Sequence, residues 1–198
     1  YKFLHDRVQQ AAYSLIPESD KQATHLKIGK LLLNHTTPEA REQNIFALVN
    51  QLNFGTDLLT AQWEKDELAQ LNLTAGQKAK AAAAYPSALK YLNVGLGLLA
   101  ADTWADNYDF TLAFYLEVVE AEYLNSNFEQ SNLLAGVALE QAKTQLDQVK
   151  VYELKIYSYI AQNQMQVALD TGLQVLDMLG IQLDQEPPKN LISEDLVD

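Results

Sequence analysis

Histidine is the side chain in this sequence best suited to acid–base chemistry, metal binding or phosphate transfer near neutral pH. The chain has three histidines, His5, His25 and His35. None stands in a His-x-x-x-His or Glu-x-x-His spacing, which would place two metal ligands on one helix face. The sequence has no cysteine, so thiolate ligands and thiol nucleophiles are excluded. We therefore expect no metal and no cofactor, with His5 and His25 in packing roles and a phosphorylatable His25 as the alternative.

Three nearby carboxylates form the other group that could do chemistry: Glu117, Glu120 and Glu122. Glu117 and Glu120 stand three residues apart and share one face of a helix, where two acids could act as acid and base or bind a cation. No histidine or second acidic cluster accompanies them at a matching spacing, so we interpret them as a solvated face. A Gly-x-Ser-x-Gly elbow, a complete phosphate-binding loop and protein-kinase motifs are also absent. The sequence thus predicts a chain that is not itself an enzyme.

The charge balance excludes two classes of partner. Of 198 residues, 14 are Lys or Arg and 26 are Asp or Glu, which gives a formal net charge of −12. Such acidity opposes binding to nucleic acid and to an anionic membrane surface, since both require a basic face. Hydrophobic residues make up 48% of the chain, which is enough for a folded core. No apolar run approaches the roughly 18 residues of a membrane span, so we predict no nucleic-acid and no membrane partner.

Helix-forming residues dominate the sequence, and only 8 glycines and 5 prolines interrupt it. The interruptions predict helices over about residues 5–15, 20–34, 38–53, 60–82 and 87–100. Further breaks at about residues 102–106, 125–127, 146–147 and 162–163 separate four more helices, the last ending near Gly180. Short connections between helices favour antiparallel neighbours. The predicted fold class is therefore all-α.

Three small residues, Ala88, Ser131 and Ala168, recur 43 and 37 residues apart, each of them three positions after a bulky residue. Two helices of a hairpin approach closely only where side chains are small, so these residues would mark the crossing points of three helical hairpins. A single hairpin cannot bury its apolar face alone, and stacked neighbours do so. The pattern resembles the tetratricopeptide repeat. This resemblance implies antiparallel hairpins stacked as a right-handed superhelix.

The first helices of stacked hairpins line a concave groove, and tyrosine is a residue suited to binding surfaces. Aligned on the repeat pattern, seven side chains are predicted to face this groove and to bind a partner: Gln77, Lys80, Glu120, Tyr123, Lys150, Glu153 and Tyr157. The alternative is that the tyrosine rings pack between repeats.

The N-terminal segment carries a second resemblance. Tyr1-Lys-Phe3 precedes His5-Asp-Arg-Val-Gln-Gln-Ala-Ala-Tyr13, and His25, Ile28 and Leu32 follow. This segment resembles the end of the ATPase module in STAND-type signalling ATPases. It is most similar to the giant bacterial proteins that join a Ser/Thr kinase, an ATPase, a helical repeat region, a GAF sensor and a histidine kinase. The stretches 68–79, 121–130 and 160–165 are similar to that repeat region.

This second resemblance implies a domain organisation and a function. Residues 1–36 would be junction helices from the end of the ATPase module, residues 37–183 a TPR-like repeat region, and residues 184–198 a linker or tail. The chain would be a cytoplasmic, non-catalytic interaction or sensor scaffold that binds a protein segment or a neighbouring domain of its own chain. A small-molecule-sensing helical pocket and a His-based phosphotransfer bundle remain alternatives. The sequence leaves the oligomeric state open.

Overall fold

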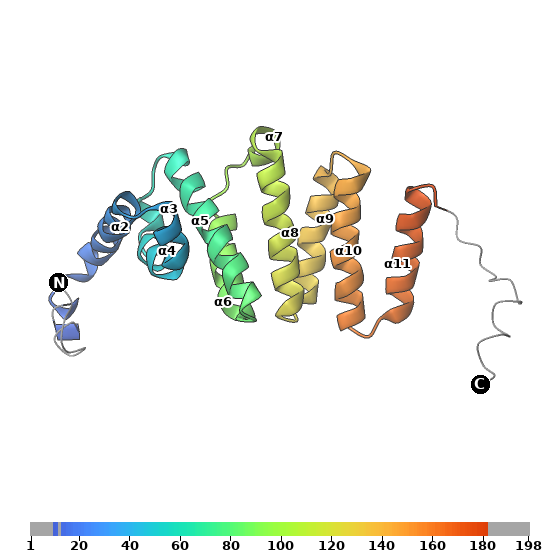
Figure 1. Cartoon of the computed structure of the whole chain (residues 1–198), viewed down its shortest axis with the longest axis horizontal. Helices are drawn as coiled ribbons and strands as arrows, with labels where there is room; N and C mark the ends of the chain where they lie inside the picture. Colours follow the sequence, from blue (N-terminus) through green and yellow to red (C-terminus); the bar gives the residue numbers. More distant parts are fainter. Residues whose placement is uncertain (1–9, 12, 182–198) are drawn as a thin grey trace, which may run out of the picture. The chain divides into compact units, whose positions relative to one another are not determined.

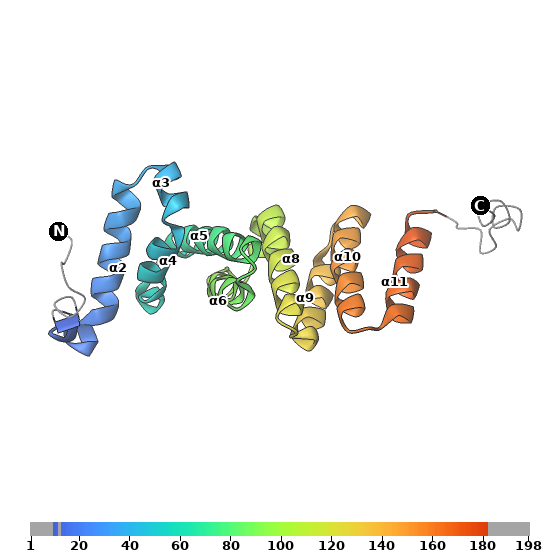
Figure 2. The same ribbon diagram turned by 60° about the horizontal axis from the view of Figure 1, so that its bottom comes forward.

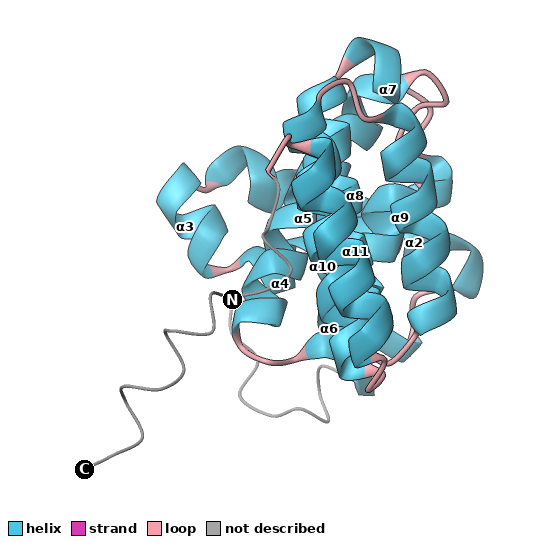
Figure 3. Ribbon diagram, turned by 90° about the vertical axis from the view of Figure 1, so that its right-hand side faces the viewer, coloured by secondary structure: helices cyan, strands magenta, loops and turns pink. Residues whose placement is uncertain are grey.

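The computed structural model describes residues 10–11 and 13–181. His5, most of the predicted first helix and the predicted tail at 184–198 lie outside the described residues. Within them, all regular elements are helical and no strand is found, which confirms the all-α class (Figures 1 and 3). The elements are α2 (Glu18–His35), α3 (Pro38–Gln43), α4 (Ile45–Asn53), η1 (Thr56–Leu58), α5 (Gln62–Ala81), α6 (Tyr85–Leu96), α7 (Thr103–Asp106), α8 (Tyr108–Leu124), α9 (Phe128–Gln141), α10 (Gln145–Ala161) and α11 (Met165–Met178).

The chain divides into two compact units, Tyr1–Leu134 and Ala135–Asp198, and each is described by itself. In the first unit α2 packs on α4, α4 on α5, α5 on α6 and α6 on α8. In the second unit α10 packs against α11. The predicted domain boundaries after residues 36 and 183 stay predictions.

The prediction of a single helix over residues 38–53 is wrong, because the helix is interrupted at Asn44 and divides into α3 and α4. Thr37 caps α3 by accepting a hydrogen bond from the backbone N–H of Ala40, with Pro38 in the first turn. At the break Asn44 has φ −109° and ψ 21°, outside the helical range, and its side-chain amide donates to the carbonyl oxygen of Ala40 at 2.9 Å.

The break predicted at residues 146–147 is also wrong, because both residues lie in the first turn of α10. The Thr144 hydroxyl oxygen accepts a hydrogen bond from the Asp147 backbone N–H at 3.1 Å and donates to the Asp147 carboxylate at 2.8 Å. The polar run is thus the N-terminal cap of a helix.

Near the middle of the chain, α6 ends at Leu96, before the predicted end at Ala100, and the predicted break at 102–106 contains the short helix α7.

The small residues of the repeat pattern are buried, as hairpin crossings require: Ala88 is 0% exposed, Ser131 2% and Ala168 6%. The Ser131 hydroxyl also donates to the backbone carbonyl of Val119 in α8 at 2.9 Å. Helices α5 and α6 approach so closely that a Cβ atom at Gly76 would lie 2.5 Å from Leu92 Cγ. These contacts support helical hairpins built around small residues, whereas the right-handed superhelix stays a prediction.

Three hairpin turns share one backbone conformation. They connect α5 to α6, α8 to α9 and α10 to α11 (Figures 1 and 2). Ala83, Ser126 and Asn163 in these turns have φ values of 55°, 63° and 59°. In each turn the following N–H donates to the carbonyl five residues earlier, which closes the helix C-terminus. These bonds join Ala84 to Ala79, Asn127 to Glu122 and Gln164 to Tyr159, each at 2.9 Å. The turns lie 43 and 37 residues apart, the spacing of the buried small residues.

Replacing Ala83 by glycine should raise the free energy of unfolding by about 1 kcal/mol. An alanine at positive φ carries a steric cost of about 1–2 kcal/mol that glycine does not, and the greater entropy of unfolded glycine offsets part of this gain. Urea unfolding of the 198-residue chain measures the change. The control is Ala113→Gly on the exposed side of α8, which should lower stability by about 1 kcal/mol. Equal losses at both positions would contradict the turn assignment.

Candidate functional site

Three of the predicted groove residues lie together on α5 and α8. Gln77 and Lys80 lie one turn apart on α5, facing Glu117 and Glu120 of α8. The Gln77 amide donates to Glu117 Oε1 at 3.1 Å, and Lys80 Nζ lies 2.5 Å from Glu117 Oε2. Lys80 also forms an ion pair with Glu120. We call Gln77, Lys80, Glu117 and Glu120 the α5–α8 polar cluster.

Burial makes this cluster more than a set of surface charges. The side chains of Lys80, Glu117 and Glu120 are 17%, 21% and 33% exposed. Burial acts to lower the pKa of Lys80, but the hydrogen bonds and negative charges of Glu117 and Glu120 outweigh it. The pKa of Lys80 therefore lies above its ordinary value of 10.5. A charged ammonium between two carboxylates holds α5 against α8 throughout the neutral pH range.

The other predicted residues separate into smaller groups. Tyr123 lies half-buried near the C-terminal end of α8. On α10, in the second unit, the Tyr157 hydroxyl donates to Glu153 Oε1 at 3.3 Å. Lys150 Nζ donates to Asp147 Oδ1 at 3.2 Å. Asp147 was not among the predicted groove residues. The structure thus joins Gln77, Lys80 and Glu120 in one cluster and Glu153 with Tyr157 in one pair.

The three carboxylates of α8 do not share one environment. Glu117 and Glu120, expected on a solvated face, are half-buried against Lys80. Glu122 is only 4% exposed and accepts a hydrogen bond from the Asn127 side-chain amide at 2.8 Å. Glu117 was missing from the predicted groove residues. The pairing could have been found by noticing that Gln77 and Lys80 on α5 repeat the three-residue spacing of the two glutamates.

His25 is held on both ring nitrogens. The Tyr13 hydroxyl lies 3.0 Å from Nε2, and Nδ1 lies 2.7 Å from Gln51 Oε1. Because the Gln51 amide oxygen can only accept, Nδ1 donates this hydrogen bond. The ring centroid lies 4.3 Å from that of Phe54. A phosphoryl group would have to displace one of these partners, so the geometry favours the packing interpretation of His25. His35 is exposed at the last turn of α2.

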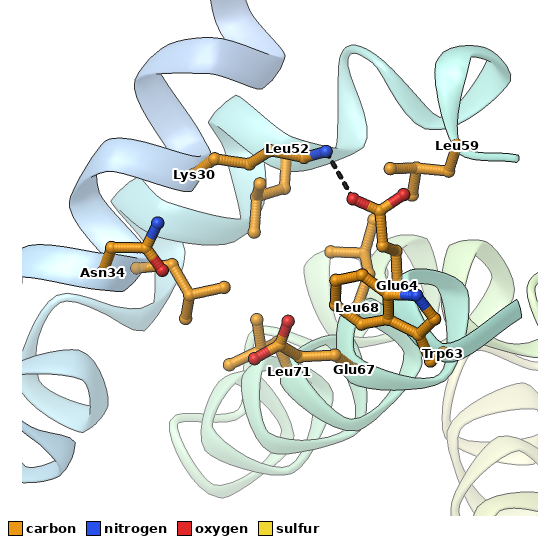
Figure 4. Close-up of a pocket in the computed structure, with 10 residues that line it drawn as sticks. Lys30, Asn34, Leu52, Leu59, Trp63, Glu64, Glu67, Leu68 and Leu71 are labelled. Carbon is orange, nitrogen blue, oxygen red and sulfur yellow. Dashed lines mark hydrogen bonds and ion pairs between the residues drawn. The ribbon is translucent and has the colours of Figure 1, made fainter. Parts of the chain in front are cut away.

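A second feature, which the sequence did not predict, is a hollow of about 120 Å³ between α2, α4 and α5. Lys30 and Asn34 come from α2, and Trp63, Glu64 and Glu67 come from α5 (Figure 4). Trp63 is 68% exposed. This exposure is unusual, because tryptophan side chains are normally largely buried. Sequence reasoning missed it, because a tryptophan in the first turn of a helix looks like any core residue.

Within the described part of the chain, no group of three His, Asp or Glu side chains is placed to hold a metal ion. The same residues contain no helix with the length and apolar character needed to cross a membrane.

Comparison with known proteins gives one informative relative. Hybrid signal transduction histidine kinase G of Dictyostelium discoideum is 29% identical to this chain over 219 residues. The alignment covers 98% of the chain and 6% of that kinase. The chain is similar to a segment of a signalling kinase. No family model and no solved structure match the sequence.

The similarity supports the signal-transduction part of the sequence prediction. The chain spans about 6% of the length of the kinase that it matches, so the similarity by itself does not assign the activity of that whole protein to this chain. The bacterial parent, the ATPase module, the Ser/Thr kinase and the cytoplasmic location stay predictions.

Proposed function

We propose that this chain is a non-catalytic interaction region of a signalling protein, which binds a protein segment or a neighbouring domain. Two findings support the proposal. The chain is similar to a segment of a hybrid histidine kinase, and its helical hairpins repeat one turn geometry at the spacing of their buried small residues. The location is cytoplasmic in this proposal, with no nucleic-acid or membrane partner, in keeping with the net charge of −12.

The observation that carries the proposal is the repeated hairpin. Repeated hairpins hold their first helices in register, so side chains on α5 and α8 are fixed by the fold before a partner arrives. The α5–α8 polar cluster has this property, since hydrogen bonds and ion pairs already position each of its members. Side chains that are ordered in advance lose less entropy on binding.

The cluster also indicates the chemistry of the partner. The cluster contains one ammonium and two carboxylates, so the net charge of the cluster is −1. The exposed parts of Glu117 and Glu120 remain available as hydrogen-bond acceptors. We therefore expect the bound segment to present positive charge or free N–H donors. Electrostatic complementarity of this kind mainly raises the association rate and the specificity.

A photo-crosslinking amino acid at Gln77, which is exposed, tests the proposal in cells that express the protein carrying this chain. We expect irradiation to join this position repeatedly to one protein segment, identified by mass spectrometry, from the same protein or from a partner. The matched control is the exposed Lys90 on α6, where the same substitution should give no such product. Equal capture at both positions, or none at Gln77, would contradict the proposed binding face.

A further inference from the structure

The hollow between α2, α4 and α5 has an apolar floor. Four of the leucines that line it, Leu33, Leu52, Leu59 and Leu68, are between 2% and 8% exposed. Trp63 stands at its edge with 68% of its surface exposed. An exposed tryptophan beside an apolar floor is typical of the residues that dominate binding energy at protein interfaces.

The charges around the hollow do not balance. Lys30 reaches from α2 to form an ion pair with Glu64 of α5, which compensates both charges (Figure 4). Glu67, one helical turn further along α5, also lines the hollow and points toward α2. Among the described residues, none forms an ion pair or hydrogen bond with the Glu67 carboxylate. The lining therefore carries one uncompensated negative charge next to the tryptophan face.

An aromatic face next to a free carboxylate attracts a cation, and a guanidinium group suits both partners. Its plane stacks on an indole, and its N–H fork fits a carboxylate. The aliphatic stem of an arginine would lie on the leucine floor, as such stems commonly do on apolar surfaces. The amide oxygen of Asn34, on the opposite side of the hollow, offers a further acceptor.

The size of the hollow favours one side chain over a whole small molecule. Pockets for complete ligands usually enclose about 300–1,000 Å³, whereas this hollow encloses about 120 Å³. A cavity of about 150 Å³ holds a single benzene molecule. A guanidinium group with part of its stem is of this size, and the rest of its chain would extend into solvent past Trp63.

We propose that this hollow is a docking site for an arginine side chain of a peptide segment, held between the Trp63 indole and the Glu67 carboxylate on the leucine floor. The site involves other residues than the α5–α8 polar cluster and does not depend on the function proposed for that cluster.

NMR titration of the 198-residue chain with a short polar peptide that contains one arginine tests the site. The indole N–H signal of Trp63 should shift and saturate. The indole of Trp104, which packs against Tyr108 and Tyr115, serves as the control within the same molecule. A peptide with citrulline, which has the shape of arginine without its charge, should bind about tenfold more weakly.

The substitution Glu67→Gln should weaken binding of the arginine peptide about tenfold, while Glu129→Gln at an exposed position of α9 should change it less than twofold. Equal affinities for the arginine and citrulline peptides, or equal shifts of both indoles, would overturn the proposal. Agmatine, a small molecule with a guanidinium group, tests whether the natural ligand is a peptide or a small molecule. If agmatine bound as tightly as the arginine peptide, the hollow would be assigned to a small molecule and the peptide assignment would be overturned.

Discussion

Replacing Gly76 by alanine is expected to lower the free energy of unfolding by about 2 kcal/mol. The new Cβ atom would lie 2.5 Å from Leu92 Cγ and 2.6 Å from Leu92 Cδ2, closer than van der Waals contact allows. Leu92 is 0% exposed, and close-packed interiors leave a side chain little room to turn. Overpacking of this kind costs about 1–3 kcal/mol, and the better helix propensity of alanine returns up to about 1 kcal/mol. Chemical denaturation followed by circular dichroism measures the difference.

The matched control is Gly136→Ala in α9. No atom lies within 4 Å of a Cβ built at Gly136, so only the helix propensity changes and stability should rise by up to about 1 kcal/mol. The two substitutions are chemically identical and both lie within helices. If both raise the free energy of unfolding, then α5 and α6 do not approach as closely as described, and the hairpin interpretation of the small residues is wrong.

The predictable part of the fold depends on local chemistry. The spacing of Ala88, Ser131 and Ala168 indicated the hairpins because small side chains at helix crossings leave a trace in the sequence itself. The break at Asn44 was missed, and the break before Gln145 was predicted too late in the chain, at residues 146–147. An asparagine between two helices and a threonine cap both look like generic polar residues until their backbone geometry and hydrogen bonds are known.

The candidate site was predictable only in part, because it depends on distances between helices that are far apart in the sequence. The repeat alignment placed Lys80 and Glu120 on one surface, but it could not show that Glu117 would bond to both Gln77 and Lys80. The hollow beside Trp63 has no sequence signal, since it arises from the packing of α2 on α4 and of α4 on α5. Side chains that meet across such packing leave no periodic pattern.

Two helical glycines, Gly95 and Gly172, have different surroundings that the sequence does not indicate. Gly95 lies seven residues after Ala88 on α6, and Gly172 lies four residues after Ala168 on α11. A Cβ at Gly95 would lie 2.5 Å from Phe114 Cζ, whereas a Cβ at Gly172 would meet one atom, Ile156 Cδ1, at 3.9 Å. The same residue type therefore marks a tight contact of α6 with α8 and an ordinary contact of α11 with α10.

Replacing Lys80 by methionine is expected to lower the free energy of unfolding at pH 7 by about 2 kcal/mol. The substitution keeps the length of the side chain but leaves Glu117 and Glu120 facing each other without a counter-charge. Removing one partner costs about 3–5 kcal/mol for a fully buried pair and at most about 1 kcal/mol for an exposed one, and the exposures of 17–33% lie between these cases. Urea unfolding monitors the loss.

Lys150→Met is the control for this substitution. Lys150 also pairs with a carboxylate, that of Asp147, but its side chain is 56% exposed, so the loss should stay below about 0.5 kcal/mol. Adding Glu117→Gln and Glu120→Gln to Lys80→Met should restore most of the lost stability, because no uncompensated charge then remains. A triple variant as unstable as Lys80→Met alone would show that packing of the lysine stem, and not charge, holds α5 to α8.

The pH dependence follows from the raised pKa of Lys80. A lysine whose folded pKa exceeds its unfolded value stabilises the fold fully below the unfolded pKa of about 10.5, and this stabilisation is lost as the pH rises through the folded pKa. The difference in unfolding free energy between the wild-type chain and Lys80→Met should therefore stay constant from pH 7 to about pH 10 and shrink above it. Other lysines and tyrosines titrate in both proteins, so their contributions cancel in the difference. A difference that vanished near pH 7 would mean that Lys80 is not charged between the two glutamates, and the α5–α8 polar cluster would then have no ordered charge to present to a partner.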